Sequence, residues 1–433
     1  MLSQALTVLF LATSVTSIAV RHRQRFPGPY CQTRRPLQCC PGRDDSCTVP
    51  IRDTVCYCDE FCGIHNAEDC CPDYENVCLA QWATTSKSPP TNECFHEGRL
   101  YGVGQTIQKD CNTCKCVTSW SNLDLQTWEC ENLACINEPA LVEGVNRGRY
   151  GWTARVYNKF DGVSVIDGLR YYLGTIPPKS QVKELFPVKA NIEGLPIEFD
   201  SREQWPTYIH PAMDQGRCAA SWAFSTAGVT ADRWSIQSGG EVLDDLSVQR
   251  MISCGNVEGC DNGGRVEDAW SYLQKEGTVS EYCHPYTSGV SRQSQRCTYI
   301  EESACRDNLV YKTTPPYRIA RDERRIMKEI MRNGPVQAII TVHPDFYLYE
   351  SGIYSHTREE FLLLERNHTI SGTHSVKIIG YGEENGVKFW RCVNSWGQSW
   401  GERGMFRIKR GTDEVGIEDF VVAVWPSHGP GLN

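Results

Sequence analysis

Apolar residues in the C-terminal half of the chain recur at helical spacing in two stretches. Trp222, Val229 and Ile236 lie seven residues apart, a spacing that keeps side chains on one face of a helix. This pattern predicts a largely buried helix of about five turns that begins at Ser221. The second stretch, RDERRIMKEIMRN, ends at the sequence NGP (333–335), where glycine and proline stop a helix.

Other stretches predict strands and shorter helices. VQAIITV, SVKIIGYG, VKFWRCVNSW and GMFRIKR are rich in β-branched and aromatic residues and are bounded by glycines, as strands commonly are. Between residues 137 and 194, four-residue spacings predict short helices, and two prolines end the pattern. The spaced pairs are Leu141 with Val145 and Val165 with Leu169, and the prolines are Pro177 and Pro178.

The N-terminal residues 1–17 have the pattern of a secretory signal. An apolar run, Leu6 to Ala12, precedes small residues that suit cleavage after Ser17. No later segment offers the roughly 20 apolar residues that a membrane helix needs. We therefore expect a secreted, soluble protein without a membrane span. The net charge of −9 gives no general attraction to nucleic acid, and the basic stretch 21–25 is read as a solvated terminus.

The 23 cysteines support an oxidising compartment, where disulfides replace a hydrophobic core in small modules. The 433 residues predict two to four folded units. The first cysteine cluster is Cys31, Cys39, Cys40, Cys47, Cys56, Cys58, Cys62, Cys70, Cys71 and Cys78. The second cluster is Cys94, Cys111, Cys114, Cys116, Cys130 and Cys135. Zinc ligation is the alternative, but paired CxxC knuckles are lacking, so disulfides without metal or cofactor are expected.

Two N-terminal modules resemble known extracellular domains. CYCDEFC and DCCPDY make residues 27–82 similar to a somatomedin B domain, although ten cysteines replace the usual eight and the pairing stays open. After a polar linker at 83–92, residues 93–136 resemble half of a von Willebrand factor type C module. The first resemblance implies binding to other extracellular proteins. A role as a structural spacer is equally consistent with it.

Residues 195–426 resemble the papain family, closest to its cathepsin B branch. Six motifs occur in the family's order, among them DQGRCAASWAFST, GTHSVKIIGYG and FWRCVNSWGQSWG. The resemblance implies an α+β fold with a helical lobe, a β-barrel-like lobe and a cleft between them. Residues 137–194 resemble the propeptide that lies along this cleft, and residues 427–433 form a tail.

The same resemblance implies the site. Gln215 corresponds to the oxyanion-hole donor, His374 and Asn394 to the catalytic histidine and asparagine, and Trp396 to the shielding indole. Ser221 occupies the position of the nucleophilic cysteine. Three further positions depart from the family pattern: Ala219 and Thr373 replace glycines, and Phe420 replaces a glutamate at the base of the specificity pocket. The remaining cleft residues are Trp222, Gly263 and Gly264, although GCDNGG carries one extra residue.

Oxygen in place of sulfur removes the thiolate chemistry. A hydroxyl ionises roughly 7 pK units above a thiol, which costs on the order of 10 kcal/mol. A helix terminus supplies at most about 2 kcal/mol. Serine peptidases instead use a carboxylate behind the histidine, where this chain has Asn394. We therefore expect no catalysis, and Ser221 is interpreted as a helix N-cap.

The papain resemblance also implies cysteine pairing. It pairs Cys218 with Cys260; we expect Cys254 with Cys297 and Cys283 with Cys305. Cys392 is left as a buried free thiol. Asn367, in NHT, is an N-glycosylation sequon. The paired histidines of the cathepsin B occluding loop have no match in CHPYTSGVSRQSQRC (283–297).

The order of modules is similar to that of the tubulointerstitial nephritis antigen family. This resemblance implies a secreted, non-catalytic protein of the extracellular matrix whose partners are matrix or cell-surface proteins. Two alternatives remain. One is a weak or unconventional hydrolase that uses Ser221 and His374. The other is a ligand-sequestering modular protein in which residues 195–426 serve only as a scaffold.

Overall fold

The structure is a computed structural model that describes residues 28–35, 37–52, 54–62, 69–79, 93–119, 126–179, 193–255, 259–297, 309–357 and 371–427. The predicted signal, the linker 83–92, Cys305 and Asn367 lie outside these residues. The chain divides into two compact units, which are described separately. One unit is Met1–Val103 with Cys116–Thr127, and the other is Gly104–Lys115 with Trp128–Asn433.

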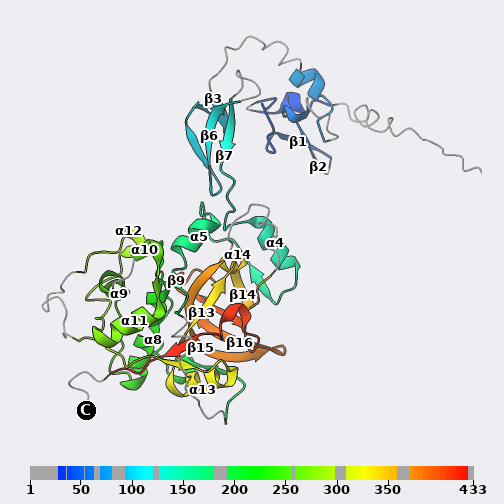
Figure 1. Ribbon diagram of the computed structural model, residues 1–433. Coiled ribbons are helices and arrows are strands. Elements are labelled where there is room, and N and C mark those ends of the chain that lie inside the picture. Colours follow the sequence, from blue (N-terminus) through cyan, green and yellow to red (C-terminus); the bar gives the residue numbers. More distant parts are fainter. Residues whose placement is uncertain are drawn as a thin grey trace, which may run out of the picture. The chain divides into compact units, whose positions relative to one another are not determined.

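The core of the first cysteine cluster consists mainly of sulfur (Figure 1). Its elements are η2 (Cys31–Thr33), the antiparallel pair β1 (Thr48–Ile51) and β2 (Thr54–Tyr57), and η3 (Glu75–Leu79). Five disulfides join Cys31–Cys58, Cys39–Cys78, Cys40–Cys47, Cys56–Cys71 and Cys62–Cys70. The zinc alternative is contradicted, because a cysteine in a disulfide has no thiolate to offer a metal.

The second cluster forms two small sheets. Its strands are β3 (Glu93–His96), β4 (Arg99–Gly102), β5 (Thr106–Lys109), β6 (Asn112–Thr118) and β7 (Gln126–Cys130). The disulfides are Cys94–Cys116, Cys111–Cys135 and Cys114–Cys130. The boundary between the two compact units crosses this module, whereas the sequence predicts one module over residues 93–136.

A nine-stranded sheet organises the larger unit, and its order is β12-β18-β13-β15-β16-β17-β14-β8, with β10 pairing to β15. The four predicted strands are β13, β15, β16 and β17 and are confirmed. The bounds are β8 (Trp152–Ala154), β10 (Phe199–Asp200), β12 (Tyr317–Ile319), β13 (Val336–Val342), β14 (Tyr349–Tyr354), β15 (Gly372–Glu384), β16 (Val387–Val393), β17 (Met405–Lys409) and β18 (Val421–Ala423).

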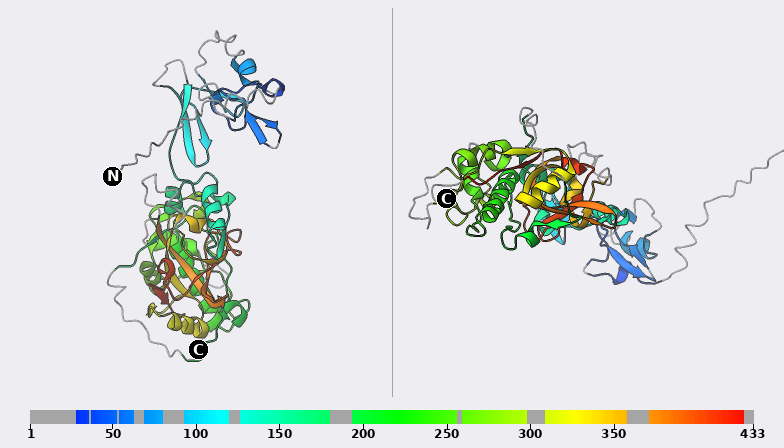
Figure 2. Two further views of the ribbon diagram at one scale, coloured as in Figure 1. Left: turned by 90° about the vertical axis from the view of Figure 1, so that its right-hand side faces the viewer. Right: turned by 90° about the horizontal axis from the view of Figure 1, so that it is seen from below.

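The green helices within residues 221–291 form the other lobe of this unit beside the sheet, whereas the yellow helix at residues 323–333 lies against the sheet itself (Figure 2). The predicted long helix is α8 (Ser221–Gln237), and fourteen of its 17 residues are buried. The second predicted helix is α13 (Glu323–Asn333), which ends at Gly334. The other helices within residues 195–426 are α7 (Ser201–Gln204), α9 (Val248–Cys254), α10 (Gly259–Asn262), α11 (Val266–Lys275), α12 (Ser288–Ser291), α14 (Pro344–Tyr347) and η7 (Glu414–Gly416).

The propeptide-like stretch is built into the same core. It contains α4 (Pro139–Arg147), β8, η4 (Asn158–Phe160), α5 (Val165–Tyr171) and β9 (Thr175–Ile176), so both predicted helices are confirmed. β8 pairs with β14 and extends the sheet. Leu141 and Phe160 are fully buried in one cluster with Trp390 and Trp396 of the papain-like domain. The stretch is therefore part of the folded unit.

Candidate functional site

The predicted site residues meet where the helical lobe faces the sheet. Ser221 is the first residue of α8, His374 lies on β15, and Asn394 follows directly after β16. Gln215 lies on the loop before α8, and its backbone N–H donates to Ser395 O at 2.8 Å. Gln215, Ser221 and His374 are completely buried.

His374 is held by Asn394. Its Nε2 lies 2.7 Å from Asn394 Oδ1, which also accepts the backbone N–H of Ser395. Oδ1 is an acceptor, so Nε2 carries the proton of the neutral ring. Burial lowers the pKa of His374 to about 4, although the Asn394 contact opposes the shift. Within the described part of the chain, Nδ1 has no hydrogen-bond partner.

The hydroxyl of Ser221 is engaged elsewhere. Its Oγ lies 2.9 Å from Thr175 Oγ1 and accepts the backbone N–H of Ser375 at 3.4 Å. The N-cap interpretation of Ser221 is wrong, because Ala220 is the N-cap and no side chain caps the helix. Ser221 instead starts the helix itself, and its hydroxyl contacts a residue of the propeptide-like stretch.

A carbonyl of that stretch takes both donors expected of an oxyanion hole. Leu173 O accepts from Gln215 Nε2 at 3.1 Å and from the backbone N–H of Ser221 at 3.2 Å. Ser395 Oγ donates to Gln215 Oε1 at 2.6 Å and so fixes the direction of the amide. In an acyl-transfer enzyme such donors stabilise the developing oxyanion. Here they hold a backbone carbonyl of the same chain.

Glycines allow this segment to approach the cleft wall. β9 pairs in parallel with β11 (Gly264–Arg265), and the Gly264 N–H donates to Gly174 O at 2.8 Å. Gly263 has φ +72°, and a Cβ there would overlap Gly174 O. Gly174, with φ +110°, lies against the backbone of Ala219 in the same manner. Gly263 and Gly264 therefore contact the backbone of Gly174, a residue of the same chain.

Lys159, which the sequence did not indicate, and Thr373, which it indicated only as a departure from glycine, anchor the segment. Lys159 Nζ lies 3.1 Å from Asp214 Oδ2 and also donates to Trp396 O. Burial lowers the pKa of Lys159, and the Asp214 carboxylate opposes this shift. Thr373 Oγ1 donates to Thr175 O. These partners lie far apart in the sequence, so no local pattern predicts their contacts. One signal for the segment is present: Gly174, in LGT, permits another backbone to approach closely.

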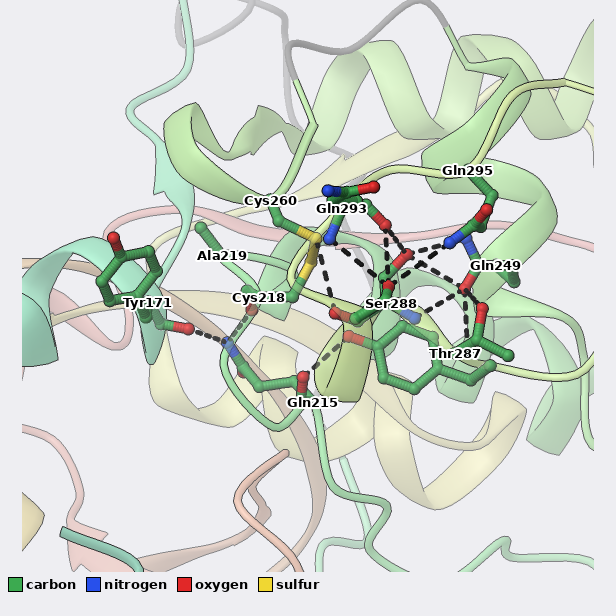
Figure 3. The surroundings of a disulfide bond; sticks show 12 residues. Tyr171, Gln215, Cys218, Ala219, Gln249, Cys260, Thr287, Ser288, Gln293 and Gln295 are labelled. Carbon is green, nitrogen blue, oxygen red and sulfur yellow. Dashed lines mark hydrogen bonds between the residues drawn. A yellow bond between two sulfur atoms is a disulfide. The ribbon is translucent and has the colours of Figure 1, made fainter. Parts of the chain in front are cut away.

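A disulfide lies beneath this part of the cleft. Figure 3 shows Gln215 beside Cys218 and Cys260, whose predicted pairing is confirmed. The Cys254–Cys297 bond is confirmed as well. Cys283 is disulfide-bonded, but its expected partner lies outside the described residues. Cys392 is a buried free cysteine as predicted, and burial raises the pKa of its thiol.

The aromatic cleft residues are all buried. Trp396 lies with its ring centroid 5.1 Å from that of His374, and its Nε1 donates to Tyr172 O at 2.7 Å. Trp222 Nε1 donates to Ala219 O at 3.2 Å. Phe420 borders a cavity of about 20 Å³ with apolar residues of α11 and β18, and Arg318 lies against its ring. The residues around Phe420 thus form a mainly apolar site.

A second cavity has a volume of about 40 Å³. Asn394, Lys377 and His210 are among its lining residues. Lys377 Nζ lies 2.6 Å from Asp232 Oδ2, and His210 Nδ1 lies 2.9 Å from Asp232 Oδ1. Burial lowers the pKa of His210, but the hydrogen bond and charge of Asp232 outweigh it, so the net shift is upward.

Comparison with known proteins places these features in a family. The model of the papain family cysteine proteases matches residues 195–425. The tubulointerstitial nephritis antigen-like protein of Rattus norvegicus is 42% identical over 92% of this chain and 88% of its own length. The tubulointerstitial nephritis antigen of Homo sapiens is 39% identical over 93% of this chain and 88% of its own.

Solved structures of proenzymes share the fold. Procathepsin B S9 from Trypanosoma congolense superimposes with a TM-score of 0.58 at 30% identity, and covers 68% of this chain and 100% of its own. Digestive procathepsin L2 from Tenebrio molitor gives a TM-score of 0.53 at 27% identity, over 65% of this chain and 87% of its own. The chain belongs to the papain family of cysteine proteases and, over nearly its whole length, to the tubulointerstitial nephritis antigen family.

Proposed function

We propose that this protein is a secreted, catalytically inactive peptidase homologue that acts by binding extracellular matrix or cell-surface proteins. One observation carries the loss of activity. Ser221 occupies the nucleophile position, and its hydroxyl contacts Thr175 and the Ser375 amide and makes no hydrogen bond to His374 among the described residues. The first step of acyl transfer requires that contact.

The site lacks the groups that a cysteine peptidase mechanism or a serine peptidase mechanism requires. A hydroxyl ionises roughly 7 pK units above a thiol, so a serine–imidazolium ion pair does not form. A serine peptidase compensates with a carboxylate that stabilises the imidazolium. The partner of His374 is the neutral amide of Asn394, and burial disfavours the charged ring. Leu173 O occupies the donors that an incoming substrate carbonyl would use.

The binding role is supported by the architecture. Eight disulfides stabilise the two N-terminal cysteine clusters, as is typical of extracellular modules with little hydrophobic core. The resemblance of the first cluster to somatomedin B domains favours a protein partner. No helix of the described residues is long and apolar enough to cross a membrane.

Peptide turnover tests the inactivity. Purified full-length protein is incubated with a broad library of peptides, beside a His374→Ala variant and an active cathepsin B at equal concentration. We expect cleavage by cathepsin B only. Turnover by the wild-type protein that His374→Ala abolishes would overturn the proposal.

A binding assay tests the second part of the proposal. We expect saturable binding of the native protein to immobilised matrix proteins, and no binding after its disulfides are reduced and alkylated.

A further inference from the structure

We propose that the hydroxyls of Ser221 and Thr373 form a clamp on Thr175, which makes the segment Leu173–Ile176 the permanent ligand of the cleft. This inference rests on the proposed function, because a cleft that no longer cleaves peptides has no need to release the segment. The term hydroxyl clamp is used below for Ser221, Thr373 and Thr175.

The two contacts hold one residue from opposite walls. Ser221 on α8 bonds the Thr175 side chain at 2.9 Å, and Thr373 on β15 donates to the Thr175 carbonyl. Thr175 is only 4% exposed, so these polar groups have little access to water. A buried hydroxyl that loses its partner retains its desolvation penalty. The hydroxyl clamp therefore favours the docked segment.

Both clamp positions depart from the papain-family pattern on which the resemblance rests. A cysteine is expected at Ser221 and a glycine at Thr373, and a glycine has no side chain with which to donate. The two substitutions thus supply hydroxyls that meet on the same residue of the segment. Ser221 Oγ thus stands where the family has its nucleophilic sulfur, and the same atom contacts Thr175 of the segment.

A close approach of two backbones restricts what the cleft accepts. The backbone of Ala219 lies so close to Gly174 that a Cβ on Gly174 would overlap it, whatever side chain residue 219 carries. The occupant must therefore have glycine beside the threonine. The Leu173–Gly174–Thr175 sequence meets this requirement, whereas a peptide with a larger residue at the Gly174 position does not.

Contacts on both sides of the clamp fix the same stretch. Before it, Lys159 binds Asp214 and Trp396 O. After it, Arg265 donates to Pro177 O, and the Lys179 N–H donates to Glu267 Oε1 at 3.0 Å. Because these contacts act together with the hydroxyl clamp, release of the segment requires that all of them break.

Amide hydrogen exchange in the full-length protein tests the clamp. The N–H groups of Gly264 and Ser221 donate to Gly174 O and Leu173 O, so their exchange reports opening of the segment. Thr175→Val keeps the side-chain shape and removes the hydroxyl. Ser221→Ala removes the partner. We expect each single variant to exchange about fivefold faster at Gly264, as the loss of one buried hydrogen bond implies.

The double variant decides whether the two hydroxyls act on each other. If they do, Ser221→Ala with Thr175→Val exchanges no faster than Ser221→Ala alone, because Thr175→Val then removes a bond already lost. We expect Thr373→Val to accelerate exchange at Gly264 to a similar extent, because it removes the separate hydrogen bond to Thr175 O. The control is Thr153→Val, because the Thr153 hydroxyl bonds Ser351 at 2.9 Å on the exposed surface. We expect this variant to leave the exchange rate at Gly264 unchanged.

Two results at Gly264 would overturn the clamp, and a third would come from the reference amides. One is unchanged Gly264 exchange in Thr175→Val, and the other is multiplication of the two single effects in the double variant. Amides of β13 serve as the internal reference, because equal acceleration there would mean global unfolding and would also contradict a local clamp. Failure of the proposed function is a separate result, since it appears as wild-type peptide turnover and not in the exchange rates.

Discussion

The imidazole of His374 donates from Nε2 to Asn394 Oδ1 over 2.7 Å, and the histidine is completely buried. This burial lowers the pKa of His374 to about 4, against about 6.5 for an unfolded chain. Between these values the unfolded chain binds more protons than the native protein. Stability is therefore lost as the pH falls from 6.5 towards 4.

Replacement of His374 by glutamine isolates this effect, because glutamine donates a similar hydrogen bond and does not titrate. We expect the difference in unfolding free energy between the wild type and His374→Gln to change by about 3 kcal/mol between pH 7 and pH 4. Urea unfolding at several pH values measures it. Parallel pH profiles for the two proteins would contradict the assignment.

His210 should behave with the opposite sign. Its pKa is raised in the folded protein by the bond to Asp232, despite the opposing effect of burial. This contribution to stability is fully present below the unfolded pKa of about 6.5 and is lost as the pH rises through the folded pKa. We expect His210→Gln to lose more stability at pH 5.5 than at pH 8.5, measured by the same unfolding experiment.

Arg233 and Glu329 connect α8 to α13 by a buried ion pair. The Nη2–Oε1 distance is 2.9 Å, and the two side chains are 1% and 8% exposed. Removal of one partner leaves an uncompensated buried charge, so Glu329→Gln should cost about 3–5 kcal/mol in unfolding free energy. Glu143→Gln breaks the exposed pair with Arg147 and should cost less than about 0.5 kcal/mol. Equal costs would refute this reasoning.

Phe160 tests whether the propeptide-like stretch is part of the folded unit. Its ring is fully buried and packs edge-on against Tyr172, Tyr347 and Trp396. Phe160→Ala should lower the unfolding free energy by about 3–5 kcal/mol. Ile166→Ala on α5 is the control, because Ile166 is 44% exposed. Separate unfolding transitions for the stretch and the papain-like domain would argue against a shared core.

Restoring the thiol should not restore the enzyme. In Ser221→Cys the Leu173 carbonyl still takes both oxyanion donors, so we expect no cleavage of fluorogenic peptides. Iodoacetamide should alkylate the new thiol slowly. Adding Gly174→Val should accelerate alkylation, because a side chain there overlaps Ala219 and displaces the segment. Rapid peptide cleavage by Ser221→Cys alone would contradict this prediction.

Sequence patterns predicted the elements whose signals are local. The helix at Ser221 follows from apolar residues at seven-residue spacing, and the four strands follow from runs of β-branched and aromatic residues between glycines. Gln215, His374 and Asn394 lie in separate motifs, and the fold brings them together as the family resemblance implies. The disulfides Cys218–Cys260 and Cys254–Cys297 agree for the same reason.

Features set by distant partners were not predictable in this way. Ser221 was interpreted as an N-cap because serine caps helices well, yet its hydroxyl contacts Thr175, 46 residues away. Lys159 reaches Asp214 across 55 residues, and nothing near it in the sequence indicates this ion pair. In the first cysteine cluster, adjacent cysteines such as Cys39 and Cys40 bond to different partners. Composition and spacing leave such pairings open.

The Cys111–Cys135 bond also has a mechanical consequence. Ile136 N–H donates to Val163 O, and Val165 N–H donates to Ala134 O, so the residues around Cys135 are joined to the start of α5. Tension applied through the Cys111 loop would pass through one covalent bond and two backbone bonds into α5. The C-terminal end of this helix leads directly to Leu173. Tension that reaches Cys111 along the chain would therefore act, through Cys135, on the helix that leads to the residues filling the cleft.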